Sequence, residues 1–167
     1  MKKIKIVICS GGTGGHLFPA KATVDSLLSY NLNSQPELPK VNITFFTDKR
    51  TLNYLQDFNT TNVTIKTIIT LQFSGKGLFY KLKSLSSMAI GGLQTLYYFI
   101  INRPKVVVAF GGYVSVPVLI AATLLRIPII LHEQNAILGR ANRLFVKFAN
   151  RIVTSFAITL GLNKYLN

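Results

Sequence analysis

The chain has 167 residues, of which 49% are hydrophobic and 14% charged, so it can bury one substantial core and is too apolar for an intrinsically disordered protein. With 19 basic and 5 acidic residues its net charge is +14, which favours anionic partners such as nucleic acid, acidic lipid or phosphorylated substrates. No basic-aromatic module or zinc-finger spacing is present, so nucleic acid is not the expected partner, and a single cysteine, Cys9, excludes a disulfide framework.

The chain begins with a predicted strand, a glycine turn and a helix. An apolar run over 4–9 predicts the strand, and one-face apolar spacing over 15–30 predicts the helix. Between them lies the stretch Gly11-Gly12-Thr13-Gly14-Gly15-His16. Glycines let a backbone turn tightly and approach a ligand, and the free N–H groups of a helix start attract an anion. The stretch therefore predicts a phosphate-binding turn, with His16 available as a base or polar contact.

Two common phosphate-binding motifs do not fit this turn. A dinucleotide fingerprint that starts at Gly12 meets Leu17 where its third glycine belongs, although Asp48, after the next strand, is placed to act as the ribose-binding acid. A P-loop needs Lys and then Ser or Thr after its last glycine, and neither is in place. A plain tight turn does not account for four glycines followed by a histidine. A dinucleotide-binding domain remains a remote alternative.

The rest of the chain alternates predicted strands and helices. The further strands are expected over 41–46, 63–69, 105–110, 128–131 and 151–155, with helices over 48–58, 116–125 and 139–149. This alternation predicts the α/β class with a Rossmann-like open parallel sheet. Two more polar turns directly follow strands: Gly111-Gly112-Tyr113, with Ser115 as the expected cap of the next helix, and His132-Glu133-Gln134-Asn135. Ligands of open α/β sheets bind at this carboxyl edge.

A long apolar and basic segment follows the loop at 72–77. Its helical spacing is typical of an amphipathic helix at an anionic membrane surface, formed by Lys76, Leu78, Phe79, Lys81, Leu82 and Lys83. The same spacing equally suits an ordinary helix that packs Leu82 and Leu85 into the core. The most apolar run, 88–101, is interrupted by Gly91, Gly92 and Gln94, so a membrane-spanning helix is not expected.

Three stretches resemble motifs of the MurG family, the N-acetylglucosaminyltransferases that convert lipid I to lipid II in peptidoglycan synthesis. They are the first glycine turn with Leu17-Phe18-Pro19, the stretch 111–115 and the stretch 132–135, in family order and at compatible spacing. The resemblance covers about residues 4–156 and fades between Pro36 and Phe73. It implies the N-terminal half of a GT-B glycosyltransferase, bound peripherally to the cytoplasmic face of the bacterial plasma membrane.

The resemblance also implies roles for the motif residues. His16 is the first choice for the base that takes the proton of the acceptor hydroxyl, and Glu133 is the second. The implied contacts to the donor, UDP-N-acetylglucosamine, are Thr13, Gly14, Gly15 and Asn135. The implied contacts to the acceptor diphosphate are Gly12, Gly111, Gly112, Tyr113 and Ser115. Val116 stands where the family usually has glycine, which is expected to narrow the approach to that diphosphate. No Asp-x-Asp pair is present, so neither a metal nor another cofactor is expected in this chain.

The family continues into a second, donor-binding domain that has no counterpart in these 167 residues. The expected organisation is therefore an acceptor- and membrane-binding domain over 1–156, an unplaced tail over 157–167, and a donor domain supplied in trans. Two other hypotheses stay open. The chain is either a non-catalytic subunit that recruits a separate donor-binding chain to the membrane, or a fragment of a decayed gene.

Overall fold

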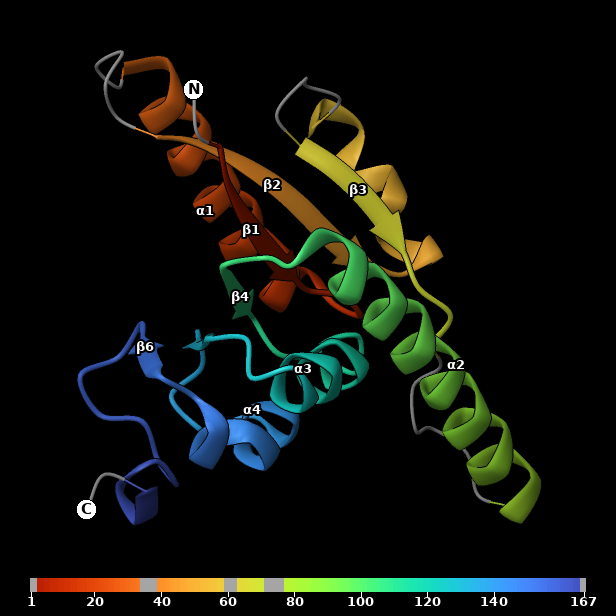
Figure 1. The fold of residues 1–167 in the computed structure, drawn as a ribbon. Coiled ribbons are helices and arrows are strands. Elements are labelled where there is room, and N and C mark those ends of the chain that lie inside the picture. Colours follow the sequence, from red (N-terminus) through yellow and green to blue (C-terminus); the bar gives the residue numbers. More distant parts are fainter. Residues whose placement is uncertain (1–2, 34–38, 59–62, 71–76, 166–167) are drawn as a thin grey trace.

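The fold is a six-stranded parallel sheet covered by helices on both faces (Figure 1). The computed structural model describes residues 3–33, 39–58, 63–70 and 77–165. The strands are β1 (Lys3–Cys9), β2 (Lys40–Thr47), β3 (Val63–Thr67), β4 (Val106–Ala109), β5 (Ile129–Glu133) and β6 (Arg151–Thr154). Their spatial order is β3-β2-β1-β4-β5-β6, which confirms the predicted Rossmann-like class.

The strand order reverses between β1 and β4, which are direct neighbours in the sheet. Cys9 at the end of β1 pairs with Ala109 at the end of β4, so the chain leaves both strands at the same point of the sheet edge. Both glycine turns follow directly, and they therefore lie side by side. In open α/β sheets the crevice at such a reversal is the usual ligand site.

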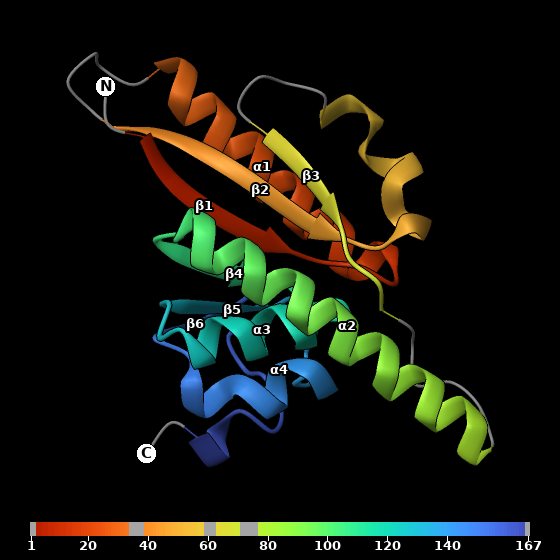
Figure 2. The same ribbon diagram turned by 45° about the vertical axis from the view of Figure 1, so that its right-hand side comes forward.

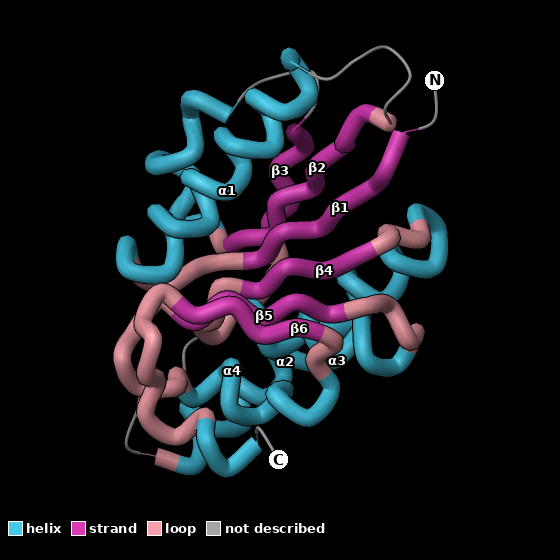
Figure 3. The backbone as a smooth tube through the Cα atoms, turned by 90° about the vertical axis from the view of Figure 1, so that its left-hand side faces the viewer, coloured by secondary structure: helices cyan, strands magenta, loops and turns pink. Residues whose placement is uncertain are grey.

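The helices are distributed over the two faces of the sheet (Figure 3). Helix α1 (Gly14–Asn33) covers one face, and α2 (Leu78–Asn102), α3 (Ser115–Leu124) and α4 (Arg140–Phe145) cover the other. Short 3-10 helices complete the fold: η1 (Lys49–Phe58), η2 (Val146–Phe148) and η3 (Asn163–Tyr165). The helix expected over 48–58 is thus a 3-10 helix, and the one expected over 139–149 is split between α4 and η2.

Each face of the sheet has its own core. Successive side chains of a strand point to opposite faces, so Phe45 packs under α1 while Phe46 packs against Phe99 of α2, and all three are fully buried. Burial on both faces explains why β4, Val106–Ala109, reads as a continuous apolar run.

Helix α2 buries small side chains and exposes large apolar ones. Its buried stripe is Ser84, Ser87, Gly91, Thr95 and Phe99. A side chain at Gly91 would place its Cβ 2.5 Å from the carbonyl oxygen of Ile69, so the helix lies too close to the chain after β3 for anything but glycine. Leu82 and Leu85 are 55% and 58% exposed, so the interpretation that they pack into the core is wrong.

The outward face of α2 forms an apolar ridge, which we define as Leu82, Leu85, Ile90, Leu93, Tyr97, Ile100 and Ile101. The N-terminal half of the helix projects beyond the sheet in two views (Figures 1 and 2). Among the described helices, none is both long enough and apolar enough to cross a membrane.

Residues 157–165, to which the sequence assigns no place, pack against the domain. Leu160 forms a β-bridge with Ile137, and its N–H donates to the carbonyl oxygen of Ala136 at 2.8 Å. Leu162 is buried in the core on the side of α3 and α4.

Candidate functional site

The two glycine turns pack directly against each other. Gly12, Gly111 and Gly112 have φ values of 95°, 86° and 79°, a region that disfavours every residue with a side chain. An added Cβ on Gly112 would lie 2.4 Å from the carbonyl oxygen of Gly11, and one on Gly11 would lie 2.3 Å from Val114 Cγ2. The glycines are therefore required both by backbone conformation and by contact between the turns.

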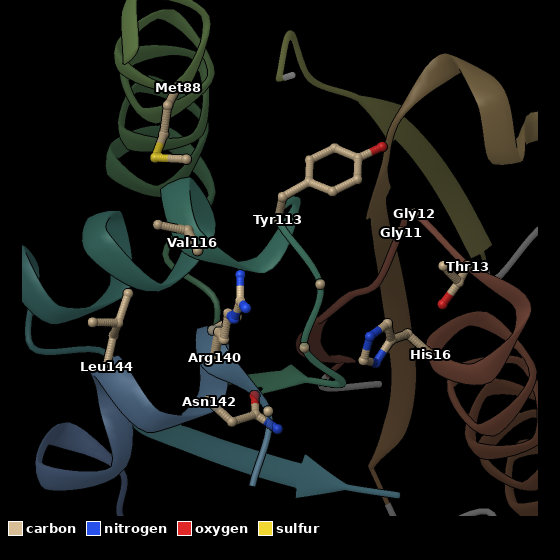
Figure 4. Close-up of a pocket in the computed structure, with 14 residues that line it drawn as sticks. Gly11, Gly12, Thr13, His16, Met88, Tyr113, Val116, Arg140, Asn142 and Leu144 are labelled. Atoms are coloured by element: carbon tan, nitrogen blue, oxygen red, sulfur yellow. The ribbon is translucent and has the colours of Figure 1, made fainter. Parts of the chain in front are cut away.

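A cavity of about 450 Å³ opens over these turns (Figure 4). Its walls come from the starts of α1, α3 and α4, with Met88 contributed by α2. Six of the site residues predicted from the sequence line this cavity: Gly12, Thr13, His16, Gly111, Gly112 and Tyr113. Val116 also lines it.

Two neighbours hold the His16 imidazole on one side. Its Nδ1 lies 2.9 Å from the carbonyl oxygen of Phe110 and 2.5 Å from Gln134 Nε2. A carbonyl oxygen can only accept, so we assign the proton to Nδ1. Two N–H donors repel each other at this distance, so we assign the Gln134 amide in the turned-over orientation, which gives its buried, unpartnered Oε1 this N–H as a donor. In this tautomer Nε2 keeps its lone pair, and it has no hydrogen-bond partner among the described residues. The imidazole thus carries a base-competent nitrogen at the cavity wall.

Glu133 lies in a different environment. It is 1% exposed and does not line the cavity. One carboxylate oxygen accepts from the backbone N–H and the side-chain amide of Asn135, at 3.1 and 2.9 Å. The other accepts from the Gly139 N–H at 2.8 Å and from Asn142 Nδ2 at 2.9 Å. The carboxylate braces the end of β5 against the start of α4.

Tyr113 links the second glycine turn to the end of β2. Its hydroxyl donates to the buried Asp48 carboxylate and accepts from the Arg50 guanidinium, and Arg50 Nε also donates to Asp48 at 3.1 Å. The other Asp48 oxygen accepts from the Thr51 N–H at 3.1 Å and from its hydroxyl at 3.0 Å. Asp48 is the acid that a dinucleotide site would need to bind ribose, and both of its carboxylate oxygens already accept hydrogen bonds within the protein. The Tyr113 ring covers Gly12, where an added Cβ would lie 2.8 Å away.

Ser115 is fully buried and does not line the cavity. It is the first residue of α3, and its hydroxyl donates to the carbonyl oxygen of Gly111 at 2.7 Å. The predicted helix cap is therefore wrong, because the residue before the helix is Val114 and no side chain caps it. Ser115 instead holds the second turn in shape.

The other predicted residues are distributed outside the cavity. Gly14, Gly15 and Asn135 are exposed at the same edge of the sheet without lining it. On α2, Lys81, Leu82 and Lys83 are exposed. Lys76 and the side chains of Leu78 and Phe79 lie outside the described residues.

Sequence reasoning missed Arg140 and Asn142, which contribute the α4 wall of the cavity (Figure 4). They stand at the helix start that follows the third polar turn, as His16 stands at the helix start after the first. That shared position was the signal that could have found them.

Comparisons with known proteins agree with this geometry. A family model described as the glycosyltransferase family 28 N-terminal domain matches residues 6–154. A protein of Rhodospirillum rubrum named UDP-N-acetylglucosamine--N-acetylmuramyl-(pentapeptide) pyrophosphoryl-undecaprenol N-acetylglucosamine transferase is 38% identical over 154 residues, which are 92% of this chain and 37% of that protein. The protein of the same name from Wolbachia pipientis is 40% identical over 154 residues, 92% of this chain and 39% of its own length.

A solved structure leads to the same family. The crystal structure of Acinetobacter baumannii MurG superposes with a TM-score of 0.76 at 27% identity, covering 93% of this chain and 43% of that one. The chain thus spans about two fifths of the length of the relatives it matches, and its sheet is that of the N-terminal half of a GT-B glycosyltransferase. From this agreement of motifs, fold and matched residues, the chain belongs to glycosyltransferase family 28, of which it carries the N-terminal domain.

Proposed function

We propose that this chain is the acceptor-binding half of an enzyme that transfers N-acetylglucosamine from UDP-N-acetylglucosamine to lipid I, giving lipid II for peptidoglycan. The names of its relatives describe a transfer of N-acetylglucosamine to an N-acetylmuramyl-(pentapeptide) pyrophosphoryl-undecaprenol. The observation that carries the proposal is His16 at the wall of the cavity, with one nitrogen held by Phe110 and Gln134 and the other free.

In the proposed reaction His16 Nε2 takes the proton of the acceptor hydroxyl while that oxygen attacks the anomeric carbon. The bond from that carbon to the diphosphate breaks, uridine diphosphate leaves and the configuration inverts. A base must reach the proton it removes, and only one of the two candidates lines the cavity. Glu133 is buried and accepts from four donors, so we assign it the role of bracing the turn that supports the site.

The glycine turns are proposed to hold the acceptor diphosphate. Gly12, Gly111 and Gly112 all line the cavity. At Gly111 no side chain fills the space between His16 and Asn142, so an anion can approach the backbone there. Gly14, Gly15 and Asn135 are exposed at the edge of the sheet where the cavity lies, and Thr13 lines the cavity, so we expect the donor held by a second domain to approach there.

The apolar ridge of α2 supports a peripheral position on a membrane. It places large apolar side chains in water, with the exposed ammonium groups of Lys81 and Lys83 beside them. This combination binds surfaces of anionic lipid. A lipid-linked acceptor would then reach the cavity from the cytoplasmic face of the bacterial plasma membrane.

Sugar transfer by separated and combined halves tests the proposal. We expect the 167-residue chain to bind a lipid-diphosphate analogue weakly, to bind little UDP-N-acetylglucosamine, and to transfer no sugar. Transfer is expected after a family donor domain is added in trans or by fusion, because positioning both substrates supplies up to about 7–11 kcal/mol of the barrier reduction. Sugar transfer by the purified chain alone would overturn the proposal that the acceptor and the donor are bound by separate domains. Membrane binding without turnover in the combined protein would favour a recruiting subunit.

A further inference from the structure

The side-chain amide of Asn142 is locked in one orientation at the cavity wall. Asn142 is 1% exposed, and its Nδ2 donates to the carbonyl oxygen of His132 at 3.0 Å and to Glu133 Oε2 at 2.9 Å. The first partner can only accept, and the carboxylate accepts its other bonds as well, so turning the amide over would set oxygen against oxygen. Oδ1 is therefore fixed on the side that faces the cavity (Figure 4).

This carbonyl oxygen is buried and has no hydrogen-bond partner in the part of the chain that the structure describes. The place that a Cβ on Gly111 would occupy lies 3.5 Å from Asn142 Oδ1 and 3.3 Å from His16 Nδ1. The oxygen and the proposed base thus flank the same part of the cavity. Buried polar atoms are almost always satisfied, so whatever fills this space must offer Oδ1 a hydrogen-bond donor.

A positive charge lies two residues away. Arg140, the first residue of α4, is exposed and projects into the cavity between Val116 and His16 (Figure 4). The ion pairs found among the described residues join Lys21 to Asp25 and Arg50 to Asp48, so the Arg140 guanidinium has no carboxylate partner there. Guanidinium groups bind phosphate oxygens in a bidentate geometry, which suits this position to an anion.

We propose that the α4 end of the cavity is a subsite for a sugar attached to a phosphate group. Arg140 contacts the phosphate, and Asn142 Oδ1 accepts a hydrogen bond from a hydroxyl or amide N–H of the sugar. This subsite rests on the proposed function, since it assigns the sugar to the acceptor. A site built to pair with a donor group rejects ligands that lack it, because its own polar atom is then left unsatisfied. Asn142 is thus a specificity-determining residue.

Two probes, one without and one with the sugar, test the subsite on the 167-residue chain: farnesyl diphosphate and farnesyl-diphospho-N-acetylmuramic acid. We expect the probe with the sugar to bind about tenfold more tightly, the effect of one hydrogen bond. Asn142→Ala should remove this preference and leave the affinity for farnesyl diphosphate within about threefold of the original. Arg140→Gln should weaken both probes equally.

The matched control for charge is Arg143→Gln. Arg143 lies on the same helix, donates to the carbonyl oxygen of Leu138 at 3.2 Å and does not line the cavity. It should therefore leave both affinities unchanged. Since Asn142→Ala also removes bonds to Glu133, a second measurement needs no variant: the ¹³Cγ resonance of Asn142 in the unsubstituted chain. This resonance should move on addition of the sugar probe and stay in place with farnesyl diphosphate.

The outcomes separate this subsite from the proposed function. Two results would overturn the subsite and leave diphosphate binding intact. One is an equal response of the Asn142 ¹³Cγ signal to both probes. The other is a preference for the sugar probe that survives in Asn142→Ala. Failure of both probes to bind overturns the subsite and the acceptor function together.

Discussion

His16 Nδ1 lies 2.9 Å from the carbonyl oxygen of Phe110, the residue that directly follows β4. This contact joins the helix after the first glycine turn to the strand before the second. It fixes which imidazole nitrogen carries the proton and so which one is available to a substrate.

Replacing His16 by Ala in an assembled two-domain enzyme should lower turnover by about 10²–10⁴, the usual weight of general-base catalysis. Initial rates of sugar transfer at saturating substrate measure the effect. His132→Gln is the control, because the ring of His132 does not line the cavity. A loss below about fivefold for His16→Ala, with the fold intact, would reject His16 as the base and return the role to Glu133.

Gln134 should determine how firmly the imidazole is held. Gln134→Leu removes one of the two acceptors at Nδ1, and we expect turnover to fall about tenfold, the value of one hydrogen bond, with little change in KM. Gln134→Glu keeps an acceptor oxygen and should retain more of the activity.

The chain has only two histidines, so ¹⁵N spectra of the imidazoles can be assigned from one variant. Wild type and Gln134→Glu should show His16 with its proton on Nδ1, whereas Gln134→Leu should show a mixture of tautomers. An unchanged spectrum and unchanged turnover in Gln134→Leu would remove Gln134 from the mechanism.

Much of this architecture is predictable from sequence because the strong signals are local. Six apolar runs that alternate with segments of helical apolar spacing identify the parallel sheet. The glycines that follow β1 and β4 identify the edge of the sheet where a ligand binds. Contacts between distant segments are not encoded in any window. Nothing near His16 reveals that its imidazole meets Phe110 and Gln134, and nothing near Tyr113 reveals that its hydroxyl reaches Asp48.

Helix α2 shows a second limit of sequence reasoning. Helical spacing places Leu82 and Leu85 on one face, but it does not say whether that face is the one turned to the core. The answer depends on how closely the helix approaches Ile69, and the missing side chain at Gly91 permits a close approach. The small residues were therefore the ones that packed inward.

The chain should bind vesicles of anionic lipid and be released by rising salt. Lys76, Lys81 and Lys83 should each contribute about 1 kcal/mol at such a surface, so exchanging all three for Gln should abolish most of the binding. Vesicle sedimentation over a salt series measures it. The control replaces Lys3, Lys5 and Lys40 by Gln. These lysines lie near the starts of β1 and β2, at the opposite edge of the sheet, so their replacement should have little effect on vesicle binding. Equal binding to neutral vesicles would contradict the membrane interpretation.

Stability should fall in mild acid because of His132. Burial lowers the pKa of this imidazole below its ordinary value of 6.5, so the folded state binds fewer protons than the unfolded state there. The His132 contribution to stability is therefore complete above about pH 6.5 and is lost as the pH falls toward the lower, folded-state pKa. Urea unfolding between pH 7.5 and 5 measures the slope. His132→Gln should flatten the curve, and an unaltered slope would show that another group is responsible.

The contact between Gly11 and Gly112 has an evolutionary consequence. The Gly11 carbonyl oxygen occupies the volume that a side chain on Gly112 would need, and Val114 occupies the volume that a side chain on Gly11 would need. A substitution in one turn would therefore be tolerated only together with a change in the other, which makes these positions epistatic. Natural diversification of this domain must then proceed away from the contact between the two turns.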